Sequence, residues 1–198
     1  PFALVTFHPE TGADAPDPAV QSAALCHAME AVKGIFWLIT GSNADAGGEV
    51  CSAAMRAFAA AHPDRAGFVQ SLGLKRYLSA MEYASLVAGN SSSGVVETPS
   101  FGVPTVNIGN RQAGRIQCAN VLSCGGEAGE IEAALRRALS PEFAALAKTA
   151  RSPYNGGDTA GKIVRVLASR IATPAMTGAK TFYDGPVPEF DPMAEPVL

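Results

Sequence analysis

Short, continuously apolar segments alternate with longer segments of helical periodicity, and this alternation constrains the fold more than any other feature. Apolar runs rich in Val, Ile, Leu or Phe, typical of buried strands, occupy Ala3–Phe7, Ile35–Ile39, Gly67–Val69, Leu86–Ala88 and Thr105–Ile108. Strands that are apolar throughout are buried on both faces, as in parallel sheets whose strands are joined by helices. We therefore predict an α/β fold, a Rossmann-like parallel sheet with helices on both faces.

Helix signals fill the intervals between these runs. Asp17 followed by Pro18 is a start signal, with Asp as N-cap and Pro at the first helical position, and a helix is predicted from there to about Lys33. Further helices are predicted over Glu49–Ala61, Lys75–Ala84, Glu130–Leu139 and Asp158–Ile171. Prolines interrupt every pattern after Thr173. We predict one domain over residues 1–172 and a Pro-rich arm over residues 173–198.

Composition excludes several classes of protein. The 198 residues are 47% hydrophobic and 17% charged, which excludes a disordered chain, and the net charge of −3 without a Lys/Arg block gives no nucleic-acid footprint. The longest apolar runs, such as Gly34–Thr40, are too short to span a bilayer. The cysteines have neither a disulfide nor a zinc spacing, and Cys118 and Cys124 are expected in the core. We expect a cytoplasmic protein without metal, nucleic-acid or membrane partners.

The first residues suggest that more protein precedes them. Pro1 leads directly into an apolar strand, and a strand in that position needs neighbours. We expect the chain to begin inside a longer protein, so that part of an active site lies outside it.

Polar residues are concentrated in the loops that follow the predicted strands, where open parallel sheets bind their ligands. After the strand at Leu86–Ala88 come Ser91, Ser92, Ser93 and Gly94, and then the start of a helix. Backbone N–H groups and hydroxyls there can bind an anion, and a glycine lets the chain approach a phosphate closely. Alternatively, the serines only cap the helix. Glu97 can accept hydrogen bonds from two vicinal hydroxyls of a sugar, or can be a capping-box residue.

Three other loops at the same edge carry candidate residues. His8 directly follows the first strand, although a lone histidine is more often structural, as His27 and His62 on helices are expected to be. The loop after the second strand contains Asn43 and Asp45. Arg111 follows the fifth strand and can bring a fixed positive charge to this edge. Arg115 is either a second such charge or a solvated residue at a helix start.

Three motif matches in the sequence are incomplete or lack context. The segment Gly89–Ser93 approaches the hydrolase elbow G-x-S-x-G but ends in Ser93, and all three histidines lie upstream of it. The segment Gly156–Lys162 follows most of a P-loop, but Ile163 replaces the Ser or Thr that binds Mg²⁺; Asp158 as a helix N-cap explains it better. Asn90–Ser92 is formally a glycosylation sequon, without any sign of secretion.

Together these loops resemble those of a known family. The segments that carry the resemblance are Val5-Thr-Phe-His8-Pro, Asn43-Ala-Asp45-Ala-Gly, Gly89-Asn-Ser-Ser-Ser-Gly-Val-Val-Glu97 and Pro104-Thr-Val-Asn-Ile-Gly-Asn-Arg111-Gln-Ala-Gly-Arg115, with Lys180–Asp184 near the end. They are similar to the UDP-N-acetylglucosamine 2-epimerases, in particular to the hydrolysing branch that serves sialic acid and related nonulosonate synthesis.

The resemblance implies the two-domain GT-B architecture, in which two Rossmann-like halves face each other across a cleft. This chain is similar to the C-terminal, UDP-binding half alone. The N-terminal half, with the acid/base carboxylates, is absent from it. The family's properties further imply a UDP-sugar substrate, a homo-oligomer (dimer or tetramer) and no metal or nicotinamide cofactor.

The resemblance also implies roles for individual residues. His8 would contact the diphosphate and assist the reacting centre, Ser91 and Ser92 would bind phosphate, and Glu97 would bind the ribose hydroxyls. Asn43 would line the nucleotide site, the backbone near Leu72 would meet the uracil, and Arg111 would complete the pocket. Gly94, as noted above, is expected to admit the phosphate.

The implied reaction removes the C2 proton while UDP leaves C1, and then adds water to the 2-acetamidoglucal to give N-acetylmannosamine and UDP. The sequence leaves open whether the sugar is UDP-N-acetylglucosamine or a 2,4-diacetamido-trideoxy analogue, because the sugar faces the absent half. Two other functions remain open: a GT-B glycosyltransferase, and a nucleotide-sugar binding module without turnover.

Overall fold

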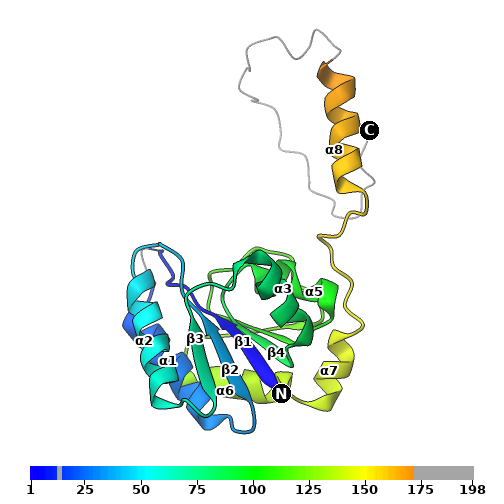
Figure 1. The fold of residues 1–198 in the computed structure, drawn as a ribbon. Helices are drawn as coiled ribbons and strands as arrows, with labels where there is room; N and C mark the ends of the chain where they lie inside the picture. The colour runs from blue at the N-terminus through cyan, green and yellow to red at the C-terminus, as the bar shows by residue number, and fades with distance from the viewer. Residues whose placement is uncertain (13–14, 172–198) are drawn as a thin grey trace. The chain divides into compact units, whose positions relative to one another are not determined.

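The computed structural model describes residues 1–12 and 15–171 (Figure 1). The predicted Pro-rich arm at 173–198 and the Lys180–Asp184 segment lie outside the described residues. The chain divides into two compact units, of which the first is Pro1–Asn155 and the second begins at Gly156. This boundary lies before α8 (Thr159–Ile171), the last helix among the described residues. The division into a domain over residues 1–172 and an arm over residues 173–198 stays a prediction.

A parallel sheet of six strands forms the centre of the first unit. Its strands are β1 (Phe2–Thr6), β2 (Phe36–Thr40), β3 (Ala66–Val69), β4 (Leu86–Gly89), β5 (Thr105–Ile108) and β6 (Val121–Cys124). They pair in the order β3-β2-β1-β4-β5-β6, and every pairing is parallel. The predicted parallel sheet is therefore confirmed, and the five predicted strands lie within about one residue of their expected bounds.

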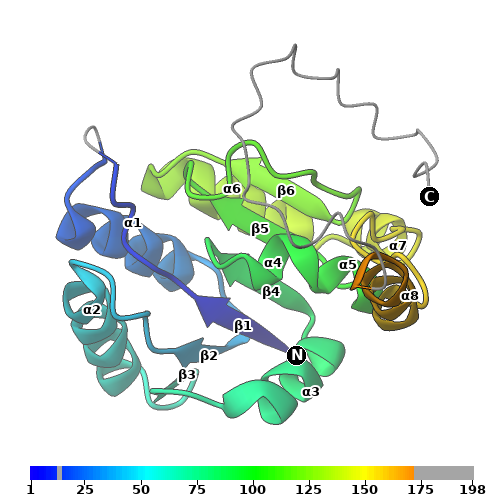
Figure 2. The same ribbon diagram turned by 90° about the horizontal axis from the view of Figure 1, so that it is seen from above.

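Helices cover both faces of this sheet, as predicted (Figure 2). One layer contains α1 (Pro18–Ala31), α2 (Gly48–Ala61) and α6 (Ala128–Ala138). The other layer contains α3 (Gly73–Tyr83), α4 (Ser93–Val96) and α5 (Thr98–Phe101). Helix α7 (Pro141–Ala147) follows α6 in the chain. Alternate residues of β1 supply the two cores. Ala3 and Val5 pack in the larger cluster with α1, and Leu4 packs with Met81 of α3.

Three details of this fold depart from the prediction. β6 is missed because it is only half-buried, with Ser123 exposed, and so has no continuous apolar run. Helix α7 is also missed, although Ser140 and Pro141 repeat the start signal of Asp17 and Pro18: the Ser140 Oγ accepts a hydrogen bond from the Phe143 N–H at 3.2 Å. The single helix expected after the serines is two short helices that meet at Glu97.

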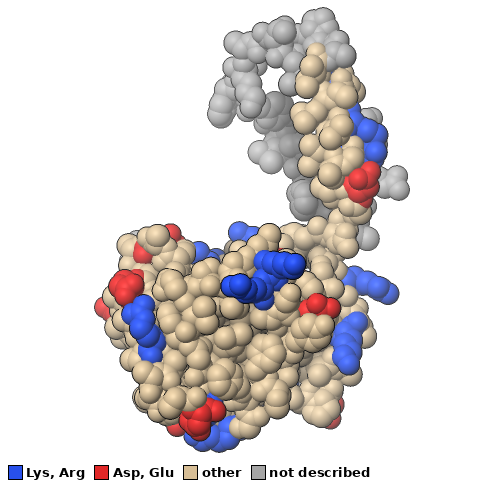
Figure 3. Space-filling model, viewed as in Figure 1, with Lys and Arg blue, Asp and Glu red and all other residues tan. Residues whose placement is uncertain are grey.

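The remaining surface features are unremarkable in charge and hydropathy. On the face of the first unit drawn in Figure 3, acidic and basic side chains are interspersed. No described helix is long and apolar enough to cross a membrane. Across residues 1–12 and 15–171, no three His, Cys, Asp or Glu side chains gather as metal ligands do. Cys124 packs against the larger core as expected, whereas Cys118 is only half-buried and contacts the Arg151 carbonyl.

The strand order fixes where a ligand can bind. The chain runs outward from β1 to β2 and β3, then returns to place β4 on the other side of β1. In open α/β sheets such a reversal leaves a crevice outside the carboxyl ends of the two central strands, and ligands bind there. The loops that open this crevice begin at Phe7 after β1 and at Asn90 after β4.

Candidate functional site

A buried asparagine joins the loops at this crevice. Asn90 follows β4 and is fully buried. Its Oδ1 accepts from the His8 N–H at 2.8 Å, and its Nδ2 donates to the His8 carbonyl at 2.7 Å. Its own carbonyl accepts from Gln112 Nε2 at 2.8 Å and from Arg111 Nη1 at 3.3 Å. Asn90 therefore holds the residues after β1 and β5 in fixed positions, a role that its sequence context did not indicate.

The contacts of His8 define the form of its imidazole. Its Nδ1 lies 3.0 Å from the Asn43 backbone nitrogen and 3.2 Å from the Ser42 Oγ. A backbone N–H only donates, so Nδ1 is the acceptor and the neutral ring carries its proton on Nε2. Burial, and next the positive charge of Arg111, lower the pKa of His8 to about 4 against a smaller opposing effect of Asp45. At neutral pH His8 is thus an uncharged donor through Nε2–H.

Arg111 and Asp45 stand beside this imidazole. An Arg111 Nη2 lies 3.7 Å from the Asp45 Oδ2, and the same carboxylate oxygen accepts from Asn43 Nδ2. The side chain of Arg111 is mostly buried, with 27% of it exposed. The loops after β1, β2, β4 and β5 thereby place a fixed positive charge and a neutral donor at one edge of the sheet.

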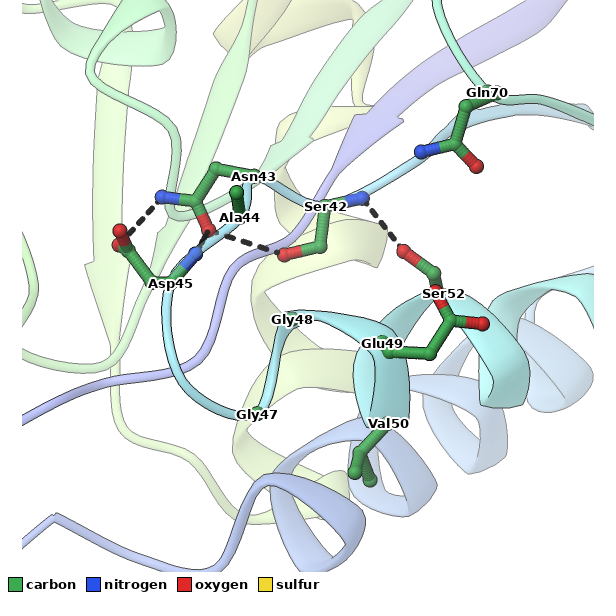
Figure 4. A pocket seen from close by; sticks show the side chains of 10 residues that line it. All are labelled: Ser42, Asn43, Ala44, Asp45, Gly47, Gly48, Glu49, Val50, Ser52 and Gln70. Carbon is green, nitrogen blue, oxygen red and sulfur yellow. Dashed lines mark hydrogen bonds between the residues drawn. The ribbon is translucent and has the colours of Figure 1, made fainter.

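The loop after β2 borders an open hollow of about 450 Å³ next to these residues (Figure 4). Its lining is Ser42, Asn43, Ala44, Asp45, Gly47, Gly48, Glu49, Val50, Ser52 and Gln70. The Ser42 N–H donates to the Ser52 Oγ at 2.9 Å, which ties the loop to α2. A Cβ at Gly48 would collide with the Asn43 carbonyl, so this position requires glycine. The fold therefore fixes the loop that presents Asn43 to the imidazole of His8.

The serines after Asn90 cap α4 only weakly. The Ser93 N–H donates to the Ser91 Oγ at 3.4 Å, and Ser92 lacks a side-chain capping bond. Among the described residues the Ser92 hydroxyl has no hydrogen-bond partner, so capping does not account for it. Gly94 is buried, and a Cβ there would lie 3.3 Å from Thr105 Cγ2, so its missing side chain lets α4 pack closely on β5. Its predicted place beside a phosphate stays a prediction.

Glu97 lies at the break between α4 and α5. Neither helix has a side-chain capping bond, so the capping-box alternative is wrong. Burial raises the pKa of the Glu97 carboxyl. Glu97 lines a hollow of about 290 Å³ together with Leu78, Val96, Ser100, Phe101, Ser152, Tyr154 and Asn155. In the described part of the chain no hydrogen bond links it to His8, Asn43 or Arg111, and its hollow shares no lining residue with the one beside Asn43.

The remaining candidates occupy more ordinary positions. Leu72 immediately precedes α3, and its side chain packs against the core cluster of Leu4 and Met81, which leaves only its backbone at the sheet edge. His62 ends α2 and lies 2.7 Å from Glu30 Oε2, away from the crevice, as expected of a structural histidine.

A parallel sheet with this strand order, and with polar side chains gathered in the loops at its carboxyl edge, defines a Rossmann-like domain, of which GT-B proteins contain two. The chain belongs to the UDP-N-acetylglucosamine 2-epimerase family, whose model matches residues 1–168.

Individual relatives agree with this assignment. The chain is 31% identical over 140 residues to a GDP/UDP-N,N'-diacetylbacillosamine 2-epimerase (hydrolyzing) of Campylobacter jejuni, covering 71% of this chain and 36% of the relative. It is 30% identical over 186 residues to the polysialic acid biosynthesis protein P7 of Escherichia coli, covering 93% of this chain and 46% of that relative. The UDP-GlcNAc 2-epimerase of Neisseria meningitidis, solved with UDP-GlcNAc bound, superposes with a TM-score of 0.66 at 13% identity, covering 85% of this chain and 44% of that one. The chain therefore spans less than half the length of these relatives.

Proposed function

We propose that this chain is the UDP-binding half of a hydrolysing UDP-N-acetylglucosamine 2-epimerase. Family membership and the hydrolysing relative from Campylobacter support the reaction type. The observation that carries the proposal is the imidazole of His8, whose Nδ1 accepts from the Asn43 N–H while Asn90 holds the His8 backbone. Its Nε2–H is left to donate beside Arg111. A neutral donor next to a cation suits a diphosphate that gains negative charge as it leaves.

The proposed reaction divides its chemistry between two parts of the protein. Residues outside this chain remove the C2 proton of the sugar while the C1–O bond to UDP breaks, which gives a 2-acetamidoglucal. His8, Arg111 and the hydroxyls of Ser91 and Ser92 stabilise the departing UDP. Water then adds across the glycal double bond, and the 2-epimeric free sugar is released. The substrate is UDP-N-acetylglucosamine or its 2,4-diacetamido-trideoxy analogue. Residues outside this chain that contact the sugar determine which of the two is bound.

The first test separates binding from turnover. We expect the 198-residue chain to bind UDP in calorimetry and to release no UDP from UDP-N-acetylglucosamine, because it contains the phosphate donors but no proposed C2 base. The longer protein serves as the positive control for turnover. Release of UDP by the chain alone at rates near an ordinary enzyme's ~10 s⁻¹ would contradict the proposal. A chain that binds no UDP at all would also contradict it.

A second test concerns Glu97 and the ribose. Glu97→Gln should weaken UDP binding by roughly 1–3 kcal/mol, because a charged acceptor of hydroxyl hydrogen bonds becomes a neutral one. The loss should be smaller for 2′-deoxy-UDP, which offers one hydroxyl fewer. Glu142→Gln on the exposed surface of α7 is the matched control. Equal losses of affinity for UDP and 2′-deoxy-UDP would show that Glu97 does not bind the ribose hydroxyls.

A further inference from the structure

An unbroken row of hydroxyl groups runs from the middle of the sheet to the serine loop. It begins at Thr40 and Thr6, whose Oγ1 atoms lie 2.7 Å apart at the ends of β2 and β1. The Tyr77 hydroxyl lies 3.1 Å from Thr6 Oγ1 and 2.7 Å from Ser93 Oγ. Ser93 Oγ in turn lies 3.1 Å from Ser91 Oγ. Ser91 is the residue proposed above to meet the phosphate.

Tyr77 is the central member and comes from a different layer of the fold. It belongs to α3, and its ring packs against the core cluster that contains Leu4 and Met81. Its hydroxyl is thus fixed in position by apolar packing, while the two threonines on its inner side are buried. The phenol connects a rigid part of the domain to a loop whose helix, α4, is only four residues long.

The number of protons in this row limits what it can do. Each hydroxyl has one proton to donate and can accept as well. If the Ser91 hydroxyl donates its proton outward to an anion, it must accept a hydrogen bond from the Ser93 hydroxyl. The Ser93 oxygen in turn accepts from the Tyr77 hydroxyl. The phenol then accepts from Thr6, and Thr6 from Thr40. The four contacts within the row are all satisfied in this orientation, and the 3.3 Å bond from Thr40 Oγ1 to the Val5 carbonyl is given up.

We propose that Tyr77 is a positioning residue for the phosphate-binding serine loop, through this row of hydroxyls. It orients Ser93, and through Ser93 it turns the proton of Ser91 toward the bound diphosphate. Aligned hydroxyls also polarise one another, which makes the last one a better donor. This inference rests on the proposed function, since it takes the anion at Ser91 to be the diphosphate of UDP.

The test is UDP affinity of the full 198-residue chain with Tyr77→Phe, which removes one oxygen and keeps the packed ring. We expect UDP to bind roughly 3- to 10-fold more weakly, the range for loss of one hydrogen bond. Uridine, which has no phosphate, should bind the variant and the wild type equally. Tyr83→Phe, on the exposed side of the same helix, should change neither affinity.

A double-mutant cycle separates this role from a merely structural one. In a Ser91→Ala background Tyr77→Phe should have no further effect on UDP, and Ser93→Ala alone should weaken UDP as Tyr77→Phe does. Thermal melts of every variant identify those that have lost their fold. Normal UDP binding by Tyr77→Phe, or an equal loss for uridine and UDP, overturns the inference while the proposed function stands. A wild-type chain that does not bind UDP overturns both.

Discussion

In the two-part enzyme proposed above, His8→Ala should lower kcat by roughly 10²- to 10⁴-fold, the range for a positioned electrostatic or proton-transfer group. The imidazole is a neutral donor through Nε2–H, because Nδ1 is occupied by the Asn43 N–H and the pKa of His8 is lowered to about 4. A donor whose bond strengthens while charge develops on the leaving diphosphate lowers the barrier more than it helps ground-state binding. KM should therefore change less than kcat when UDP release is followed under steady-state conditions.

The controls for His8 separate catalysis from packing. His27→Ala, an exposed helical histidine, should leave kcat unchanged. The melting temperature of His8→Ala should change little, because its backbone hydrogen bonds to Asn90 survive the substitution. If the variant keeps its kcat and loses several degrees of melting temperature, His8 is structural and its proposed role is wrong.

The pH dependence of stability checks the same protonation state. The pKa of His8 falls from 6.5 to about 4 on folding, so between these values the unfolded chain binds more protons than the folded one. Its contribution therefore makes the free energy of unfolding decrease as the pH falls from 6.5 to 4, and adds no slope below or above that window. His8→Ala should lose this part of the slope in denaturant titrations. If the slope of unfolding free energy against pH is the same in His8→Ala and the wild type, the imidazole of His8 is exposed to solvent in the folded chain.

The sequence predicts the sheet well because burial on both faces leaves a local signature. Each of the first five strands is a continuous apolar run between helical patterns. β6 has no such signature, since it lies at the edge of the sheet and is half-buried. The order of the strands is not encoded locally, although the resemblance to a known family implies it.

The site shows the same division between local and tertiary information. His8 and Arg111 stand out because a histidine and an arginine come two and three residues after the ends of β1 and β5, strands of a parallel sheet. Asn90 and Tyr77 do not, because their roles depend on partners 82 and 71 residues away, at His8 and Thr6. The packing role of Gly94 is hidden for a related reason: a side chain there would crowd Thr105, on a strand that comes later.

Asn90 provides the largest expected effect on stability. Asn90→Ala should lower the free energy of unfolding by roughly 2–4 kcal/mol, because it leaves the His8 N–H and carbonyl without the partners they now have. The substitution keeps the backbone carbonyl of residue 90, so the bonds from Gln112 and Arg111 are retained. The measurement is chemical denaturation of the chain.

Asn110→Ala is the matched control, because Asn110 is also a loop asparagine after a neighbouring strand but is exposed. It should change the free energy of unfolding by less than about 0.5 kcal/mol. Asn90→Ala should also reduce kcat of the longer protein, since the loop that presents His8 loses its attachment to β4, whereas Asn110→Ala should not. If Asn90→Ala is as stable as Asn110→Ala, the two short hydrogen bonds to His8 contribute nothing net. The imidazole would then be positioned by Asn43 and Ser42 alone.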